Sequence, residues 1–152
     1  MGSINFEKLD KLAKLSVSTG VALQKGQNLL ITAPSDALPL VRLIAKHAYK
    51  AGAGLVTPFF SDSEITLARY KYASDESFDV AADWLYKGMG EAFDNNTARM
   101  AIAGDDPMLL SDMDPERVAR ANKANSKAYK PARERITPVS YTHLTLPTKS
   151  TV

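Results

Sequence analysis

The stretch Asn-Leu-Leu-Ile-Thr at residues 28–32 holds a short, uninterrupted apolar run, and Ala-Pro-Ser-Asp follows it at once. Continuous apolar runs of this length are typical of strands that are buried on both faces in parallel sheets. Gly-Leu-Val-Thr-Pro-Phe-Phe at 54–60 and Ala-Arg-Met-Ala-Ile-Ala-Gly at 98–104 predict two further strands. Pro58 removes a backbone N–H from the second strand, which is therefore expected at an edge of the sheet.

The segments between these strands carry apolar side chains at helical spacing. They predict helices at residues 6–21, 38–51, 62–72, 74–93 and 115–130. Asn5 is expected to cap the first helix, and Ser61 and Glu64 are expected to form a capping box for the third. Ser74 is expected to cap the fourth, which is predicted as one continuous helix, and Pro131 to end or kink the last. The inner stripe of the first helix is predicted at Phe6, Leu9, Ala13, Val17 and Val21, widened by Leu12.

Strands that alternate with helices predict right-handed crossovers and a parallel sheet. The expected fold is therefore α/β, with three layers and a short parallel sheet of the Rossmann or flavodoxin-like kind. A fourth strand is due soon after Arg135, but the sequence changes character there: after Pro138 it has no acidic residue and is rich in Thr. The sheet is accordingly expected to be truncated before its next strand.

The composition narrows the class of protein. The 152 residues are 45% apolar and 24% charged, with a formal net charge of +2, and they include no cysteine. Because the net charge is near zero, the composition gives no indication of a positively charged surface that would bind nucleic acid or an anionic membrane. No apolar run is long enough to span a membrane. The lack of cysteine excludes disulfides, thiolate metal sites and a Cys nucleophile, and it fits a reducing cytoplasm.

Catalytic and metal-binding patterns are scarce. The first strand-to-helix loop, residues 32–39, contains no glycine that would let backbone N–H groups approach a phosphate. A zinc hydrolase needs several His and carboxylate ligands, yet the only histidines are His47 and His143. His47 is expected on a helix as a structural residue, and His143 lies in the Thr-rich tail. No Gly-x-Ser-x-Gly element supports a serine hydrolase.

Asp105 and Asp106 follow the third strand, and ligands of open α/β sheets bind outside the carboxyl ends of strands. A binding site here is one interpretation. The alternative is that Asp106 caps a helix begun by Pro107, as Asp114 does before the next Pro. The basic run at 117–130 is interpreted as a solvated helix face, with a partner-binding face as the second interpretation. From the residues alone, no catalytic, cofactor-binding or metal-binding residue is assigned.

Several stretches resemble the N-terminal domain of the thermophilic metalloaminopeptidases, the family of metal-dependent exopeptidases that includes aminopeptidase T. They are collinear and run without large gaps through residues 5–135. The stretches are NFEKLDKLAKL, LQKGQNLLITAPSDALPLVRLIAKHAYKAGAGLVT, SDSEITLARYKYASDESFD, WLYKGMGEAF, AIAGDDPMLL and DPERVARANKANSKAYKPA.

The resemblance implies a cytoplasmic enzyme that removes N-terminal amino acids from peptides, uses two divalent metal ions, zinc or cobalt, and forms a homodimer. It also implies that a metal-activated water attacks the scissile carbonyl with a Glu as general base, and that the ligands and this Glu lie in a C-terminal domain. Residues 1–138 are therefore expected to be a truncated N-terminal α/β domain, without peptidase activity or bound metal of its own. The alternative is a stand-alone flavodoxin-like module that binds a small ligand near Ser35 and Asp105.

Residues 139–152 carry a different resemblance. Val-Ser-Tyr-Thr-His-Leu-Thr-Leu-Pro-Thr at 139–148 is similar to the translation of the transposon-end adapter used to fragment DNA for sequencing. The codons TCT-TAT-ACA-CAT-CTG, which are the core of that adapter, would encode residues 140–144. This segment is therefore expected to be a non-native tail. The alternative is a genuine edge strand. In such a strand the side chains at 141, 143 and 145 would lie on one face and those at 142, 144 and 146 on the other.

Overall fold

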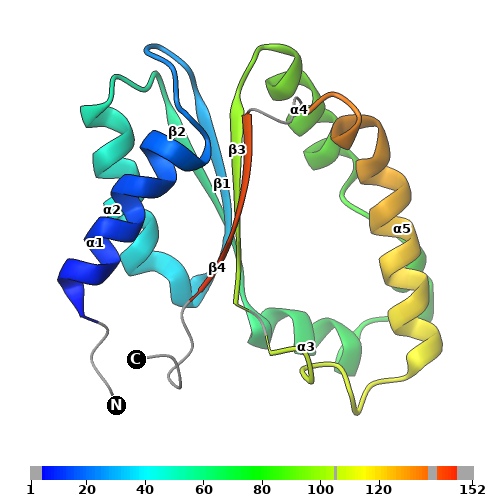
Figure 1. Ribbon diagram of the computed structural model, residues 1–152. Coiled ribbons are helices and arrows are strands. Elements are labelled where there is room, and N and C mark those ends of the chain that lie inside the picture. The colour runs from blue at the N-terminus through cyan, green and yellow to red at the C-terminus, as the bar shows by residue number, and fades with distance from the viewer. Residues whose placement is uncertain (1–4, 105, 137–139, 147–152) are drawn as a thin grey trace. The chain divides into compact units, whose positions relative to one another are not determined.

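The computed structural model describes residues 5–104, 106–136 and 140–146 (Figure 1). The chain forms two compact units. Unit 1 contains the described residues up to Ser61, together with Asn96–Gly104 and residues 140–146. Unit 2 contains Asp62–Asn95 and residues 106–136. No helix among these residues is long and apolar enough to cross a membrane.

Unit 1 is built on a parallel sheet whose strands lie in the order β2-β1-β3-β4. The strands are β1 (Leu29–Pro34), β2 (Val56–Ser61), β3 (Ala98–Ala103) and β4 (Tyr141–Thr145). Ile31 in β1 is level with Pro58 on one side and Met100 on the other. The predicted α/β class with a short parallel sheet is confirmed, and so is the edge position of β2. The predicted layer of helices on the second face of the sheet stays a prediction.

Two helices pack on one face of this sheet (Figure 1). α1 (Phe6–Leu15) runs on into a π-helical turn, η1 (Ser16–Gly20), and α2 (Leu38–Lys50) follows the 3-10 turn η2 (Ser35–Ala37). Asn5 caps α1 as predicted, because its Oδ1 accepts the N–H groups of the next turn. The core between helices and sheet includes the fully buried side chains Val21, Leu29, Ile31, Leu40, Ile44 and Met100.

The predicted inner stripe of the first helix is confirmed except at its first residue. Leu9, Ala13, Val17 and Val21 are buried, whereas Phe6 is 64% exposed. A helical side chain lies over the turn that precedes its own Cα. Phe6 begins the helix, so no such turn is present to hold its ring against the core.

The expectation that the sheet is truncated before its fourth strand is wrong for the structure. β4 pairs in parallel with β3, with Tyr141 level with Arg99 and Thr145 level with Ala103. Leu144 and Leu146 are partly buried and pack against the core of unit 1. A five-residue alternating strand therefore covers the edge of β3, whose N–H and C=O groups would otherwise be unpaired on that side.

Unit 2 consists of helices. They are α3 (Ser63–Tyr72), the 3-10 helix η3 (Asp75–Asp79), α4 (Asp83–Asp94) and α5 (Pro115–Arg133). The prediction of one continuous helix over 74–93 is wrong, because the backbone is extended at Val80, between η3 and α4. Arg69 of α3 accounts for the break: its Nη2 donates to the carbonyl oxygens of Ser77 and Val80, and this interaction competes with helical hydrogen bonding there.

The helix boundaries in unit 2 differ from the prediction at three points. Asp62, and not Ser61, caps α3, since Ser61 is the last residue of β2 and Asp62 Oδ2 accepts the first N–H groups of the helix. Asp114 caps α5 as predicted. Residues 107–112 form turns, so Asp106 does not begin a helix. Pro131 does not end α5, because Ala132 beyond it is buried and Glu134 N–H again donates to the carbonyl of Lys130.

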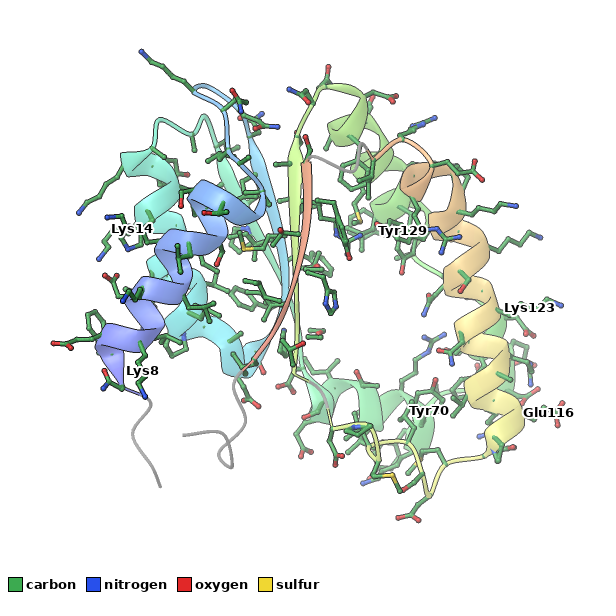
Figure 2. The ribbon with its side chains drawn as sticks, viewed as in Figure 1. Lys8, Lys14, Tyr70, Glu116, Lys123 and Tyr129 are labelled. Carbon is green, nitrogen blue, oxygen red and sulfur yellow. The ribbon has the colours of Figure 1, made fainter. Side chains whose placement is uncertain are left out.

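The core of unit 2 is small and centres on one aromatic pair. Phe78 is 0% exposed and its ring centroid lies 5.2 Å from that of Tyr70. Ala121 of α5 closes the cluster, and Tyr70 lies between α3 and α5 (Figure 2). Leu110, Met113 and Val118 pack against it as partly buried neighbours. Phe78 is therefore the side chain through which η3 joins the buried core of unit 2.

Candidate functional site

The structure places the residues predicted at the strand ends in different surroundings. Ser35 and Asp36 begin η2 directly after β1, and both are exposed. Asp105 lies outside the described residues. Asp106 is exposed and belongs to unit 2, where its Oδ1 accepts the N–H of Met108 at 2.9 Å and its carbonyl accepts the N–H of Leu109 at 3.1 Å. The Asp106 carboxylate thus stabilises its own turn.

His47 belongs to a small charged cluster that joins α1 to α2. Its Nε2 lies 2.8 Å from Oδ1 of Asp10, and Lys46 donates to the same oxygen at 3.1 Å. Only 13% of the His47 side chain is exposed, whereas the Lys46 side chain is 43% exposed. The hydrogen bond with His47, followed by that from Lys46, lowers the pKa of Asp10 below its ordinary value.

This cluster does not fit a metal centre. It offers one carboxylate and one imidazole, and the ammonium group of Lys46 already occupies the shared oxygen. His143 lies on β4, exposed and level with Ala101. Over residues 5–104, 106–136 and 140–146, no three His, Cys, Asp or Glu side chains come together to hold a metal ion. A two-metal hydrolytic site needs several converging ligands, so the described residues do not fit one.

The most extensive polar arrangement is a cluster in unit 2 that sequence reasoning missed. Arg120 of α5 binds Asp79 through two hydrogen bonds, from Nε at 2.9 Å and from Nη2 at 2.7 Å. The same guanidinium donates to Oδ1 and to the carbonyl of Asp75, both at 3.0 Å. Arg120 thereby holds both ends of η3 against α5.

Two more arginines meet this cluster around the buried ring. Nε of Arg117 lies 3.4 Å from Oδ1 of Asp75. The Arg117 guanidinium also lies over the ring of Phe78, 5.2 Å from the ring centroid. Arg69 lies over the same ring at 5.5 Å. Both contacts have the geometry of cation–π interactions. We call Arg69, Asp75, Phe78, Asp79, Arg117 and Arg120 the η3 cluster.

The interpretation of residues 117–130 as a solvated face is therefore wrong for Arg117 and Arg120. Their acidic partners lie about forty residues earlier, as the hydrogen bonds of Arg120 show. No local pattern such as an i,i+4 ion pair reveals a contact of this kind. The hydrogen bonds from Arg120 lower the pKa of Asp75 and of Asp79, and those two carboxylates in turn raise the pKa of Arg120.

Arg120→Met is expected to lower the Tm by a few degrees, roughly 2–4 °C, at pH 7. The folded-state pKa values of Asp75 and Asp79 lie below the ordinary 3.8, so their stabilising effect is complete above pH 3.8 and is lost as the pH falls through the lowered values. The Tm difference between wild type and variant should therefore shrink below pH 3.8. Thermal melts from pH 2 to pH 7 measure it.

Lys127→Met is the matched control for this prediction. It removes a cation from an exposed position on the same helix, and its Tm should stay within about 1 °C of wild type. If Arg120→Met and Lys127→Met have equal melting curves at pH 7, the η3 cluster does not stabilise unit 2.

Comparisons with known proteins give a consistent result. The solved structure of wild-type AmpT from Thermus thermophilus matches with a TM-score of 0.89 and 43% identity, over 95% of this chain and 37% of that one. Aminopeptidase T from Thermus thermophilus is 47% identical over 129 residues, which are 85% of this chain and 32% of the relative. Aminopeptidase AmpS from Bacillus subtilis is 38% identical over 122 residues, which are 80% of this chain and 30% of the relative.

The fold thus defines a parallel α/β domain of the class present in the Thermus thermophilus structure. The chain belongs to the thermophilic metalloprotease (M29) family, whose profile matches residues 5–151. It spans about a third of the length of the relatives that it matches. The family resemblance predicted from the sequence is confirmed.

Proposed function

We propose that this chain is the N-terminal part of a metal-dependent aminopeptidase that releases N-terminal amino acids from peptides. The single observation that carries the proposal is the 47% identity to aminopeptidase T over 85% of the chain. The structural match to AmpT, at 43% identity, covers 95% of the chain and therefore extends through both units. The relatives from Thermus thermophilus and Bacillus subtilis are both named as aminopeptidases.

The division of roles within such an enzyme forms part of the proposal. Two divalent metal ions, zinc or cobalt, would supply an activated water in the full-length enzyme. The described residues of this chain offer no set of ligands for them, so we place the chemistry outside this chain. Alone, the chain would neither bind the two ions nor cleave peptides. In the whole enzyme it would support the catalytic domain, narrow substrate access and contribute to a cytoplasmic homodimer.

A chimera tests the proposed function directly. The aligned segment of Thermus thermophilus aminopeptidase T is replaced by the matching residues of this chain, and hydrolysis of leucyl-p-nitroanilide is measured with zinc or cobalt. The rate of metal-dependent hydrolysis is expected to stay within about tenfold of that of the parent enzyme, because the fold is shared and the rest of aminopeptidase T is unchanged. A folded chimera that releases no p-nitroaniline would contradict the assignment.

The isolated chain provides the second arm. Purified chain incubated with the same substrate and with zinc or cobalt should release no more p-nitroaniline than buffer. Metal-dependent cleavage by the pure chain would refute the placement of the catalytic groups elsewhere. A thermal-shift screen against nucleotides on the same sample tests the flavodoxin-like alternative, which requires a large ligand-induced rise in Tm.

We also propose that residues 139–152 were read from a sequencing adapter and not from the gene. The pairing of β4 with β3 is compatible with this, because the open edge of a sheet accepts short peptides of alternating pattern. The source DNA decides. Codons at positions 140–144 that differ from TCT-TAT-ACA-CAT-CTG would rule the adapter out.

A further inference from the structure

The edge of β3 that β4 covers lies between two glycines of unit 1 (Figure 1). Gly20 ends η1, and Gly104 directly follows β3. Among the described glycines, Gly26 and Gly52 have a positive φ, whereas Gly20 and Gly104 do not. The backbone conformation therefore does not require glycine at Gly20 or Gly104, and the reason for its presence lies in the surrounding space.

Side chains of residues 141–146 fill the space beside both glycines. A Cβ atom at Gly20 would lie 3.0 Å from Oγ1 and 3.3 Å from Cγ2 of Thr142. A Cβ atom at Gly104 would lie 2.8 Å from Cβ of Leu146. Non-bonded carbon atoms pack best at about 3.5–4.0 Å, so these distances are too short. The missing side chain of each glycine thus leaves room for one side chain of the segment.

The segment presents one set of side chains to the core of unit 1. Thr142, Leu144 and Leu146 are partly buried, whereas the residues at 143 and 145 between them are exposed. Leu144 and Leu146 pack against the core, and Leu144 is level with Ile102 of β3. The N–H of Leu146 donates to the carbonyl of Ala103 at 2.6 Å, so the contact with β3 continues to the last described residue. The three inward side chains and the main chain make the contact together.

We propose that the edge of β3, together with Gly20 and Gly104, is a docking groove for an extended peptide that runs parallel to β3. We call it the β3 groove. The fitting peptide has a β-branched side chain at its first inward position and leucine at the next two. Such strand addition depends on main-chain hydrogen bonds and inward side chains, so a peptide outside the chain fits as residues 141–146 do. The docking depends neither on the proposed peptidase activity nor on the origin of residues 139–152.

The side-chain pattern decides which peptides fit the β3 groove. Successive side chains of a strand point to opposite faces, so two leucines enter the groove together only when they are two residues apart. A residue before the inward set adds a further contact. The Arg99 guanidinium lies over the ring of Tyr141, 6.0 Å from the centroid, and the two residues are level in the sheet. An aromatic side chain at this position should therefore favour binding.

Substitution of a groove glycine tests the shape of the β3 groove. Gly20→Val should displace the segment, so amide hydrogen exchange at 141–146 should accelerate about tenfold or more. Adding Thr142→Ala removes Oγ1 and Cγ2, the atoms nearest to the new side chain, and should restore most of the protection. Gly88→Val is the matched control, because an added Cβ there meets nothing within 4 Å. Equal exchange at 141–146 in Gly20→Val and Gly88→Val would overturn the assignment of the groove.

A separate peptide tests the docking itself. Leu144→Asp with Leu146→Asp puts two carboxylates where the core excludes them, so the chain's own segment should leave the β3 groove. Fluorescein-labelled Tyr-Thr-His-Leu-Thr-Leu should bind this double variant with a Kd at or below about 1 mM, measured by fluorescence anisotropy. It should bind wild type at least about tenfold more weakly, because residues 141–146 occupy the groove there.

The control peptide is Tyr-Thr-Leu-Leu-Thr-His, which has the same composition. Its leucines are adjacent and point to opposite faces in every register, so it should bind the double variant at least about tenfold more weakly. Equal affinity of the two peptides, or no half-saturation by about 1 mM, would overturn the proposal. Far-UV circular dichroism checks that the double variant is folded. The exchange experiment keeps both leucines in place, so its result decides the proposal where the double variant does not fold.

Discussion

Phe78→Ala is expected to lower the free energy of unfolding by about 3–5 kcal/mol. The Phe78 side chain is 0% exposed and stacks against Tyr70 at 5.2 Å. Two guanidinium groups, those of Arg69 and Arg117, also lie over its ring. Truncation removes the transfer free energy of the ring, leaves a cavity and deprives both cations of their aromatic partner. Urea denaturation followed by far-UV circular dichroism measures the loss.

The effect should be concentrated in unit 2. Its buried cluster consists of Tyr70, Phe78 and Ala121, so removal of the largest member leaves η3 with polar contacts alone. Whole domains are stable by only about 5–15 kcal/mol. Phe6→Ala deletes the same atoms from a position that is 64% exposed, and it should change the free energy of unfolding by less than about 0.5 kcal/mol. Equal losses in the two variants would mean that Phe78 is not the centre of this core.

The parts of the fold that the sequence predicted are those fixed by local chemistry. The apolar run at 28–32 gives β1, and the missing N–H of Pro58 places β2 at an edge. Asn5 and Asp114 cap helices because their side-chain oxygens reach N–H groups two residues on.

The prediction failed where contacts distant in sequence override local preference. A helix over 74–93 satisfies the local pattern, yet Phe78 is drawn into a core and Arg69 binds the carbonyls of Ser77 and Val80. The positions of Arg117 and Arg120 relative to Asp75 follow from the packing of α5 on η3, which no short window of sequence contains. β4 was predicted only as the alternative interpretation of its segment, because its composition differs from that of the rest of the chain although its alternation suits an edge strand.

For the candidate site, the small number of potential metal ligands in the sequence decides what can be predicted. The sequence contains two histidines, and the structure brings His47 to one carboxylate and one ammonium group. Counting potential ligands predicts that the named residues assemble no metal centre, and this stays a prediction. The η3 cluster became interpretable only once the contacts within unit 2 were known.

A pair of neighbouring substitutions in β1 should separate the two faces of the sheet. Ile31→Asp is expected to destabilise unit 1 by more than about 4 kcal/mol, because it places an unpaired carboxylate at a position that is 0% exposed. Ile31 lies in an interior strand, level with Met100 of β3, so no solvent-exposed edge is within reach of the charge. Loss of the cooperative urea transition, or a chain recovered only from inclusion bodies, is the expected observation.

Thr32→Asp introduces the same group one residue later and on the opposite face. Thr32 is partly exposed, and its Oγ1 accepts a hydrogen bond from Nη2 of Arg99 at 3.1 Å. A carboxylate can accept the same bond and pair with the guanidinium, so the free energy of unfolding should change by less than about 1 kcal/mol. Both variants carry the same low strand propensity of Asp, and this contribution cancels in the comparison. Similar urea midpoints for the two variants would mean that β1 does not present Ile31 to the core, and the register of the sheet would have to be reassigned.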